Sequence, residues 1–126
     1  MIAYPIMDLN NYGKDLKVFL SMLEQVIIDV LAKMSIVGTR IEGRTGVYVG
    51  NKKIASIGIG VKKWISFHGL SLNISNDMSL YQLIRPCDLD VEMVSVEGLL
   101  QRTVKMDEVK SYFADCFSHT FRLNYV

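Results

Sequence analysis

The sequence predicts an α+β domain in which helices flank a mainly antiparallel sheet. One long helical pattern precedes a run of alternating strand patterns, and helical patterns return only after those strands. The chain has 126 residues, of which 50% are hydrophobic and 21% charged, so its composition is typical of a globular protein. We therefore expect a single domain spanning residues 1–126.

Residues 12–34 have the pattern of a long amphipathic helix, with Gly38 as its stop signal. Its apolar face carries Leu16, Phe19, Leu20, Leu23, Ile27, Val30, Leu31 and Met34. Its polar face carries Lys14, Lys17, Ser21, Glu24, Gln25 and Lys33. We assign this helix to core packing. The preceding segment, 3–9, predicts a short strand whose Pro5 favours an edge position.

The middle of the chain predicts strands over 47–49, 54–61 and 64–74, joined by turns at Gly50–Lys53 and Lys62–Lys63. In 54–61 the odd-numbered residues are apolar, whereas the opposite face carries Ser56, Gly58 and Gly60 and is nearly bare. Glycine inside a strand marks a bulge or a close approach by another group. An extended acyl chain, a neighbouring backbone or a bulge would each explain this face.

Two further helices are expected over 79–84 and 107–121. The second carries Cys116 within its apolar stripe, where a thiol behaves as a small hydrophobe. Cys87 follows Pro86 just beyond the first helix, in irregular chain where reactive groups are often displayed. On local sequence alone, structural and reactive roles for Cys87 both stay open.

A thiol needs a nearby base or cation to react near neutral pH, because only the thiolate attacks. The candidates are His68, His119 and the lysines of the central hairpin. The two cysteines and two histidines are too dispersed to form a compact ligand set, so we expect no metal site.

Charge and targeting signals narrow the possible partners and compartment. A net charge of +1 argues against general attraction to nucleic acid or to an anionic membrane. Residues 1–5 lack the charged start and apolar run of a signal peptide, and no uncharged stretch reaches the roughly 18 residues of a membrane helix. We therefore expect a reducing, cytoplasmic setting with free thiols.

Several motifs occur in a fixed order along the chain. They are Ala3-Tyr-Pro-Ile-Met-Asp-Leu9, Glu42-Gly-Arg-Thr-Gly-Val-Tyr-Val-Gly50, Lys53-Ile-Ala-Ser-Ile-Gly58, His68-Gly-Leu-Ser-Leu-Asn73 and Arg85-Pro-Cys87. Cys87 lies 34 positions after Lys53. In these motifs and their spacing the whole chain resembles the lipoyl(octanoyl) transferase family, also called lipoate-protein ligase B.

The resemblance implies a fold shared with biotin and lipoate ligases, and a reaction without cofactor or metal. It implies transfer of octanoyl from acyl carrier protein to a lysine of a lipoyl domain, in lipoate biosynthesis. The acceptors would be lipoyl domains of 2-oxoacid dehydrogenase complexes and the glycine cleavage H protein. Nucleic acid and membrane are not expected as partners.

The resemblance also assigns roles to residues of this chain. Cys87 would hold the acyl group as a thioester, and Lys53 would favour its thiolate and then act as acid and base. The residues expected to contact the acyl chain and its carbonyl are Ser56, Ile57, Gly58, His68, Gly69, Leu70 and Ser71.

Two departures from the family pattern are visible. Asp88 follows the cysteine where the family usually has glycine, and a carboxylate there would lower the reactivity of the thiol. The family's Arg-Gly-Gly loop, which covers the acyl group, is absent upstream of Ala3. We therefore expect this chain to be the C-terminal part of such an enzyme, truncated at its N-terminus. An organelle matrix becomes the expected location if the missing part held a transit peptide.

Two other functions fit the same motifs. One is that of an inactive homologue, which only binds a carrier protein or lipoyl domain. The other is that of an amidotransferase, which moves lipoyl or octanoyl between carrier domains. Selective alkylation of Cys87 near neutral pH separates an enzyme from a binding remnant, whereas the sequence does not distinguish the donors.

Overall fold

The computed structural model describes residues 1–77 and 91–123, which form a four-stranded sheet and three α-helices. The elements run β1 (Ile2–Ala3), 3-10 helix η1 (Leu9–Tyr12), α1 (Leu16–Lys33), β2 (Val47–Val49), β3 (Lys52–Lys62), β4 (Ile65–Leu72), α2 (Val96–Leu100) and α3 (Met106–Phe121). In these ranges, no helix is both long enough and apolar enough to cross a membrane.

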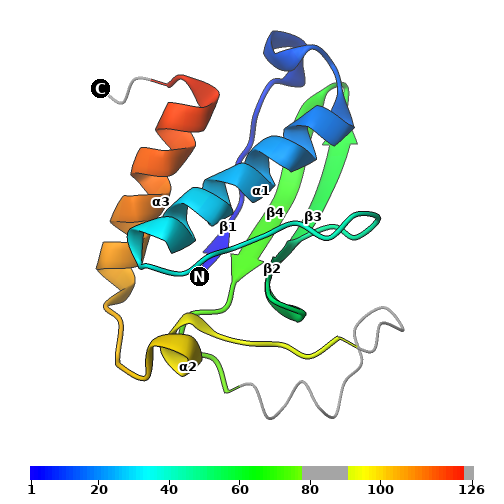
Figure 1. The fold of residues 1–126 in the computed structure, drawn as a ribbon. Helices are drawn as coiled ribbons and strands as arrows, with labels where there is room; N and C mark the ends of the chain where they lie inside the picture. The colour runs from blue at the N-terminus through cyan, green and yellow to red at the C-terminus, as the bar shows by residue number, and fades with distance from the viewer. Residues whose placement is uncertain (78–90, 124–126) are drawn as a thin grey trace.

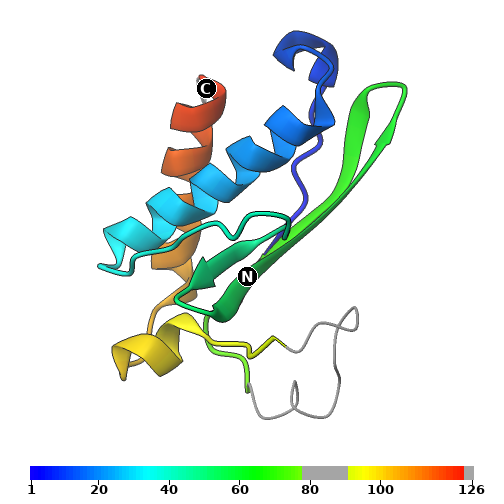
Figure 2. The same cartoon turned by 45° about the vertical axis from the view of Figure 1, so that its right-hand side comes forward.

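The sheet has the order β1-β4-β3-β2, and all three pairs of neighbouring strands are antiparallel. This confirms the predicted α+β class with a mainly antiparallel sheet. Helices α1 and α3 lie on one face of the sheet (Figure 1). Seen from the side, the opposite face of the long β3–β4 hairpin carries no helix from the described part of the chain (Figure 2).

Helix α1 confirms the predicted long helix, with shorter ends. It begins at Leu16 because the Asp15 side chain accepts hydrogen bonds from the amides of Lys17 and Val18. It ends at Lys33, and Ser35 then adopts a left-handed conformation with φ of 61°. The predicted stop at Gly38 was therefore wrong. Gly38 instead allows close packing, because an added Cβ would lie 2.8 Å from a Leu31 methyl group.

One hydrophobic core joins α1, α3 and the covered face of the sheet. Its fully buried members include Phe19, Leu23, Ile27, Val30, Leu31, Ala55, Leu72 and Val109. Cys116 belongs to the same core, which confirms its prediction as a small hydrophobe. Burial raises the pKa of the Cys116 thiol, with smaller contributions from nearby charged groups.

The predicted strand over 3–9 was wrong in its extent, because β1 covers only Ile2–Ala3. Pro5 cannot donate to a ladder, and beyond it the segment meets β4 through isolated contacts. The Ser66 amide donates to the Met7 carbonyl at 2.9 Å, and Asp8 forms a single antiparallel bridge with Ile65. The buried Ser66 hydroxyl donates to the Pro5 carbonyl at 2.7 Å and accepts from the Met7 amide at 2.8 Å. The segment therefore stays beside β4 without forming a regular ladder.

The β3–β4 hairpin confirms the two long strands of the sequence analysis. Its pairing is unbroken from Ala55↔Leu72 to Lys62↔Ile65, and Lys63 and Trp64 form the turn with positive φ angles. A bulge therefore does not explain the glycines of β3. Gly60 is covered by the Phe67 ring, whereas an added Cβ on Gly58 would meet nothing within 4 Å.

The later helices agree in part with prediction. Helix α3 confirms the one expected over 107–121. Helix α2 was not predicted, and the helix expected over 79–84 lies outside the described residues.

Candidate active site

Lys53 lies at the start of β3, between two neighbouring backbone segments. On one side it pairs with Tyr48 of β2. On the other side its amide donates to the Glu92 carbonyl at 2.8 Å, and its carbonyl accepts from the Val94 amide at 2.9 Å. The backbone of Lys53 is thus fixed from both sides, by the neighbouring strand β2 and by the segment 92–94, which lies about forty positions later in the sequence.

The Lys53 side chain lies against Gly46. A Cβ added to Gly46 would stand 2.9 Å from Cε and 3.5 Å from Nζ of Lys53, and 2.6 Å from the Ala55 carbonyl oxygen. The φ angle of Gly46 is 122°, a conformation that suits glycine. The Gly46 backbone therefore packs directly against the Lys53 side chain, and a larger residue would not fit there.

A buried carboxylate holds Gly46 in place. Oε1 of Glu24 accepts the Gly46 amide at 3.1 Å, and Oε2 accepts from Arg40 Nε at 3.0 Å. The guanidinium also donates to the Ser21 carbonyl and to Gln25 Oε1. Glu24 is only 8% exposed, so the sequence-based assignment of this residue to a polar outer face was wrong.

The residues expected to contact an acyl chain are direct neighbours in the hairpin. Ser56 pairs with Ser71, Ile57 with Leu70, and Gly58 with Gly69. The two motifs therefore lie side by side on the consecutive strands β3 and β4. Because side chains alternate, Ser56, Gly58, Gly69 and Ser71 share the face that the helices leave open.

The paired residues Ile57 and Leu70 belong to the covered face of the sheet. Leu70 is 3% exposed and lies in the core, and the half-buried Ile57 packs against that core. A ligand on the open face would therefore meet their backbone rather than their side chains. Gly69 is restricted in another way, because an added Cβ would collide with the Ala3 carbonyl.

His68 has an unusual backbone for a strand residue. Its φ is 61°, and its ring meets that of Phe67 edge to face, with centroids 4.8 Å apart. Neighbouring residues of a regular strand point to opposite faces, so this contact depends on the left-handed conformation. A non-glycine residue held in that region is strained, and such strain is often found at functional sites.

The predicted nucleophile Cys87, with Asp88, lies outside the described residues. His119 lies on α3 and is exposed, on an element separate from the sheet. Within residues 1–77 and 91–123, no three metal-ligating side chains come together.

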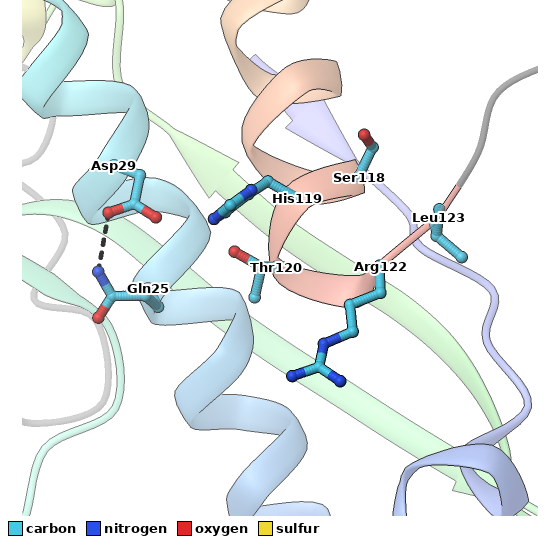
Figure 3. Close-up of a pocket in the computed structure, with 7 residues that line it drawn as sticks. All are labelled: Gln25, Asp29, Ser118, His119, Thr120, Arg122 and Leu123. Carbon is cyan, nitrogen blue, oxygen red and sulfur yellow. Dashed lines mark hydrogen bonds between the residues drawn. The ribbon is translucent and has the colours of Figure 1, made fainter.

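A separate cavity of about 750 Å³ lies between α1 and the end of α3 (Figure 3). Gln25, Asp29, His119 and Arg122 contribute to its lining, and Gln25 Nε2 donates to Asp29 Oδ1 at 2.8 Å. Among the described residues, none that was predicted to contact the acyl chain lines this cavity.

Comparison with known proteins gives the family. The model for the lipoyl protein ligase A/B catalytic domain matches residues 1–118. The chain belongs to this family. Its resemblance to the lipoyl(octanoyl) transferases is thereby confirmed.

Relatives within the family bear the name octanoyltransferase. The protein of Synechococcus elongatus is 40% identical over 124 residues, which are 98% of this chain and 53% of the relative. That of Solibacter usitatus is 40% identical over 121 residues, which are 96% of this chain and 54% of the relative. The chain thus spans about half the length of the curated relatives that it matches.

Solved structures confirm the predicted biotin and lipoate ligase fold. A biotin protein ligase from Aquifex aeolicus, in complex with biotin and ATP, superposes with a TM-score of 0.75 at 12% identity. The match covers 94% of this chain and 48% of that one. The bipartite lipoate protein ligase of Thermoplasma acidophilum gives 0.72 at 13% identity, over 98% of this chain and 51% of its own.

Proposed function

We propose that this chain carries the cysteine and lysine of an octanoyltransferase of lipoate biosynthesis. The observation that carries the proposal is the placement of Lys53 on the same strand as Ser56 and Gly58, in a family with relatives named octanoyltransferase. The donor is octanoyl-acyl carrier protein. The acceptor is a lysine of a lipoyl domain or of the glycine cleavage H protein. The reaction takes place in the cytoplasm.

The first half-reaction moves the acyl group to the enzyme. The Cys87 thiolate attacks the thioester carbonyl of the donor, and the bond from that carbonyl to the carrier sulfur breaks. The Lys53 ammonium gives its proton to the departing carrier thiolate. The products are an octanoyl-cysteine thioester, a neutral Lys53 amine and the free carrier thiol.

The second half-reaction restores the enzyme. The amine of the acceptor lysine attacks the octanoyl-cysteine carbonyl, an amide bond forms, and the Cys87 thiolate leaves. The neutral Lys53 amine takes the proton released by the attacking amine, which regenerates the ammonium. A covalent intermediate lets the two protein substrates bind in turn rather than together.

The short sequence separation between Cys87 and Glu92 supports the pairing of Cys87 with Lys53. Glu92 is hydrogen-bonded to the backbone of Lys53. Cys87 precedes Glu92 by five positions, and a chain segment of that length spans at most about 18 Å. This bound is compatible with the contact between Cys87 and Lys53 that the proposed reaction requires.

The open face of the hairpin supports an apolar ligand. Gly58 leaves free space there, and Phe67, 42% exposed, adds apolar surface over Gly60. Burying each methylene group of an acyl chain gains about 0.8 kcal/mol. Ser56 and Ser71, on the same face, supply hydroxyls for the carbonyl end.

Octanoyl transfer to a purified lipoyl domain, followed by mass spectrometry, tests the proposal. Because the relatives are longer, the assay uses the chain joined to the upstream half of the Synechococcus elongatus relative. Lys53→Ala should lower turnover at least about a hundredfold, within the range of general acid–base contributions, and Lys52→Ala should not. Equal turnover by Lys53→Ala and the wild type would reject the proposed role. Transfer from an octanoylated H protein, but not from acyl carrier protein, would favour the amidotransferase.

A further inference from the structure

Two hydrogen bonds and a close packing contact connect the core helix α1 with the end of the Lys53 side chain. They run from Arg40 to Glu24, from Glu24 to the Gly46 amide, and from Gly46 to the Lys53 methylene and ammonium groups. Glu24 belongs to α1, Arg40 and Gly46 belong to the loop that follows it, and Lys53 belongs to β3. Their contacts therefore exist only in the folded chain.

The glutamate is suited to this position because it has two separate acceptors. One carboxylate oxygen binds a main-chain amide, while the other binds a guanidinium that is also anchored to α1 through the Ser21 carbonyl. A glutamine would keep one acceptor but would present an NH₂ group to the other donor. The side chains of Arg40 and Glu24 are 39% and 11% exposed, so the arginine end faces solvent and the carboxylate is mostly buried.

The backbone of the loop has little other support near Gly46. Among the described residues, the main-chain bonds that tie 39–48 to the rest of the fold are those of the β2–β3 ladder, whereas the Thr39–Tyr48 pair closes the loop on itself. Residues 42–45 between them are exposed. Glu24 is thus the contact that fixes this loop to α1 at the residue beside Lys53.

We propose that Glu24 and Arg40 are positioning residues for Lys53, acting through the backbone of Gly46. The inference rests on the proposed role of Lys53, but the placement of the lysine can be tested without any acyl transfer. When Glu24 keeps its contacts with Arg40 and with the Gly46 amide, the Gly46 backbone restricts the directions open to Cε and Nζ of Lys53. When these contacts are lost, the loop moves away from α1 and the Lys53 ammonium becomes more accessible.

Acylation of lysines by a small water-soluble acetylating reagent measures this accessibility. The 126-residue chain is labelled briefly, and peptide mass spectrometry gives the ratio of labelling at Lys53 to that at Lys62 at the far end of β3. Glu24→Gln should raise this ratio at least about threefold, because local opening exposes the side chain. Glu42→Gln, the same chemical change at an exposed position of the same loop, should leave it unchanged.

Arg40→Ala provides a second variant, and the exposed arginine can be removed without leaving a cavity in the core. It should raise the labelling ratio in the same direction, and Arg40→Lys should restore it in part by keeping a cation beside Glu24. Thermal unfolding confirms that each variant is folded. A ratio within about twofold of the wild type, in both folded Glu24→Gln and folded Arg40→Ala, would overturn the proposal. Loss of the proposed function would show differently, as octanoyl transfer that survives Lys53→Ala.

Discussion

At the scale of single residues, two adjacent lysines have different surroundings. Lys52 forms a 3.6 Å ion pair with Glu92, and its side chain is about half exposed. Lys53 lies beside Gly46 instead. We predict that Lys53→Ala slows alkylation of Cys87 by iodoacetamide near neutral pH by about tenfold, because a nearby cation favours the thiolate. Lys52→Ala should change the rate little.

Cys116 is an internal reference for this measurement. It is 5% exposed, and burial raises the pKa of its thiol, so it should react slowly in every variant. Stopped reactions analysed by peptide mass spectrometry give both rates from one sample. If both lysine substitutions slow Cys87 alkylation equally, Lys53 has no specific role and only adds to the general positive charge near the thiol.

Sequence motifs predicted roles for Lys53 and for residues of β3 and β4, but not the contacts that hold the lysine. Glu24 follows a polar helical pattern, and that pattern alone predicts exposure. Its partners, Arg40 and the Gly46 amide, come from a loop after the helix and meet it only through tertiary packing. A sequence pattern does not show that a carboxylate will be buried against a backbone amide.

At the scale of elements, the two glycines of the hairpin should respond differently to the same substitution. A Cβ at Gly58 has free space, whereas one at Gly69 would collide with the Ala3 carbonyl. We predict that Gly69→Ala lowers the free energy of unfolding by about 1–3 kcal/mol, because the edge strand must shift. Gly58→Ala should leave stability nearly unchanged and reduce octanoyl transfer.

Urea unfolding followed by circular dichroism measures the stabilities, and the transfer assay measures the rates. Octanoyl transfer at the wild-type rate by Gly58→Ala would show that the open face is not part of the acyl site. Equal stability of the two variants would contradict the close packing of β1 on Gly69.

The longer elements could be predicted because periodicity accumulates over many residues. Helix α1, helix α3 and the β3–β4 hairpin all follow such patterns. Helix α2 has five residues, too few for a helical period to be distinguished, although Ser95 caps it by accepting from the Gly98 amide. β1 was predicted too long because its apolar residues continue past Pro5, where regular pairing stops.

At the scale of the whole molecule, apolar side chains are exposed along the β1 edge and the open face. Ile2, Tyr4 and Ile6 are 67%, 67% and 73% exposed. An edge strand with such side chains favours association between chains. We predict that the 126-residue chain self-associates and that Ile6→Lys weakens this association, as measured by sedimentation velocity. Val37→Lys, at a similarly exposed residue, is the control, and an equal effect of both would argue against the edge.

The half-length match to relatives has a consequence for catalysis. We predict that the chain alone transfers octanoyl much more slowly than the chain joined to the upstream half of the Synechococcus elongatus relative. Positioning of the reactants can lower an activation barrier by roughly 7–11 kcal/mol. A partly open acyl site loses much of this reduction. Comparable turnover by the two proteins in the lipoyl-domain assay would mean that this chain completes its acyl site by itself.

The central claim is a thioester on Cys87, and mass spectrometry of the intact joined protein tests it most directly. After incubation with octanoyl-acyl carrier protein, and without an acceptor, the wild type should gain one octanoyl group. Hydroxylamine should remove this adduct, because it cleaves thioesters, and Cys87→Ser should not accumulate it. An adduct of equal yield on Cys87→Ser that resists hydroxylamine would contradict the account.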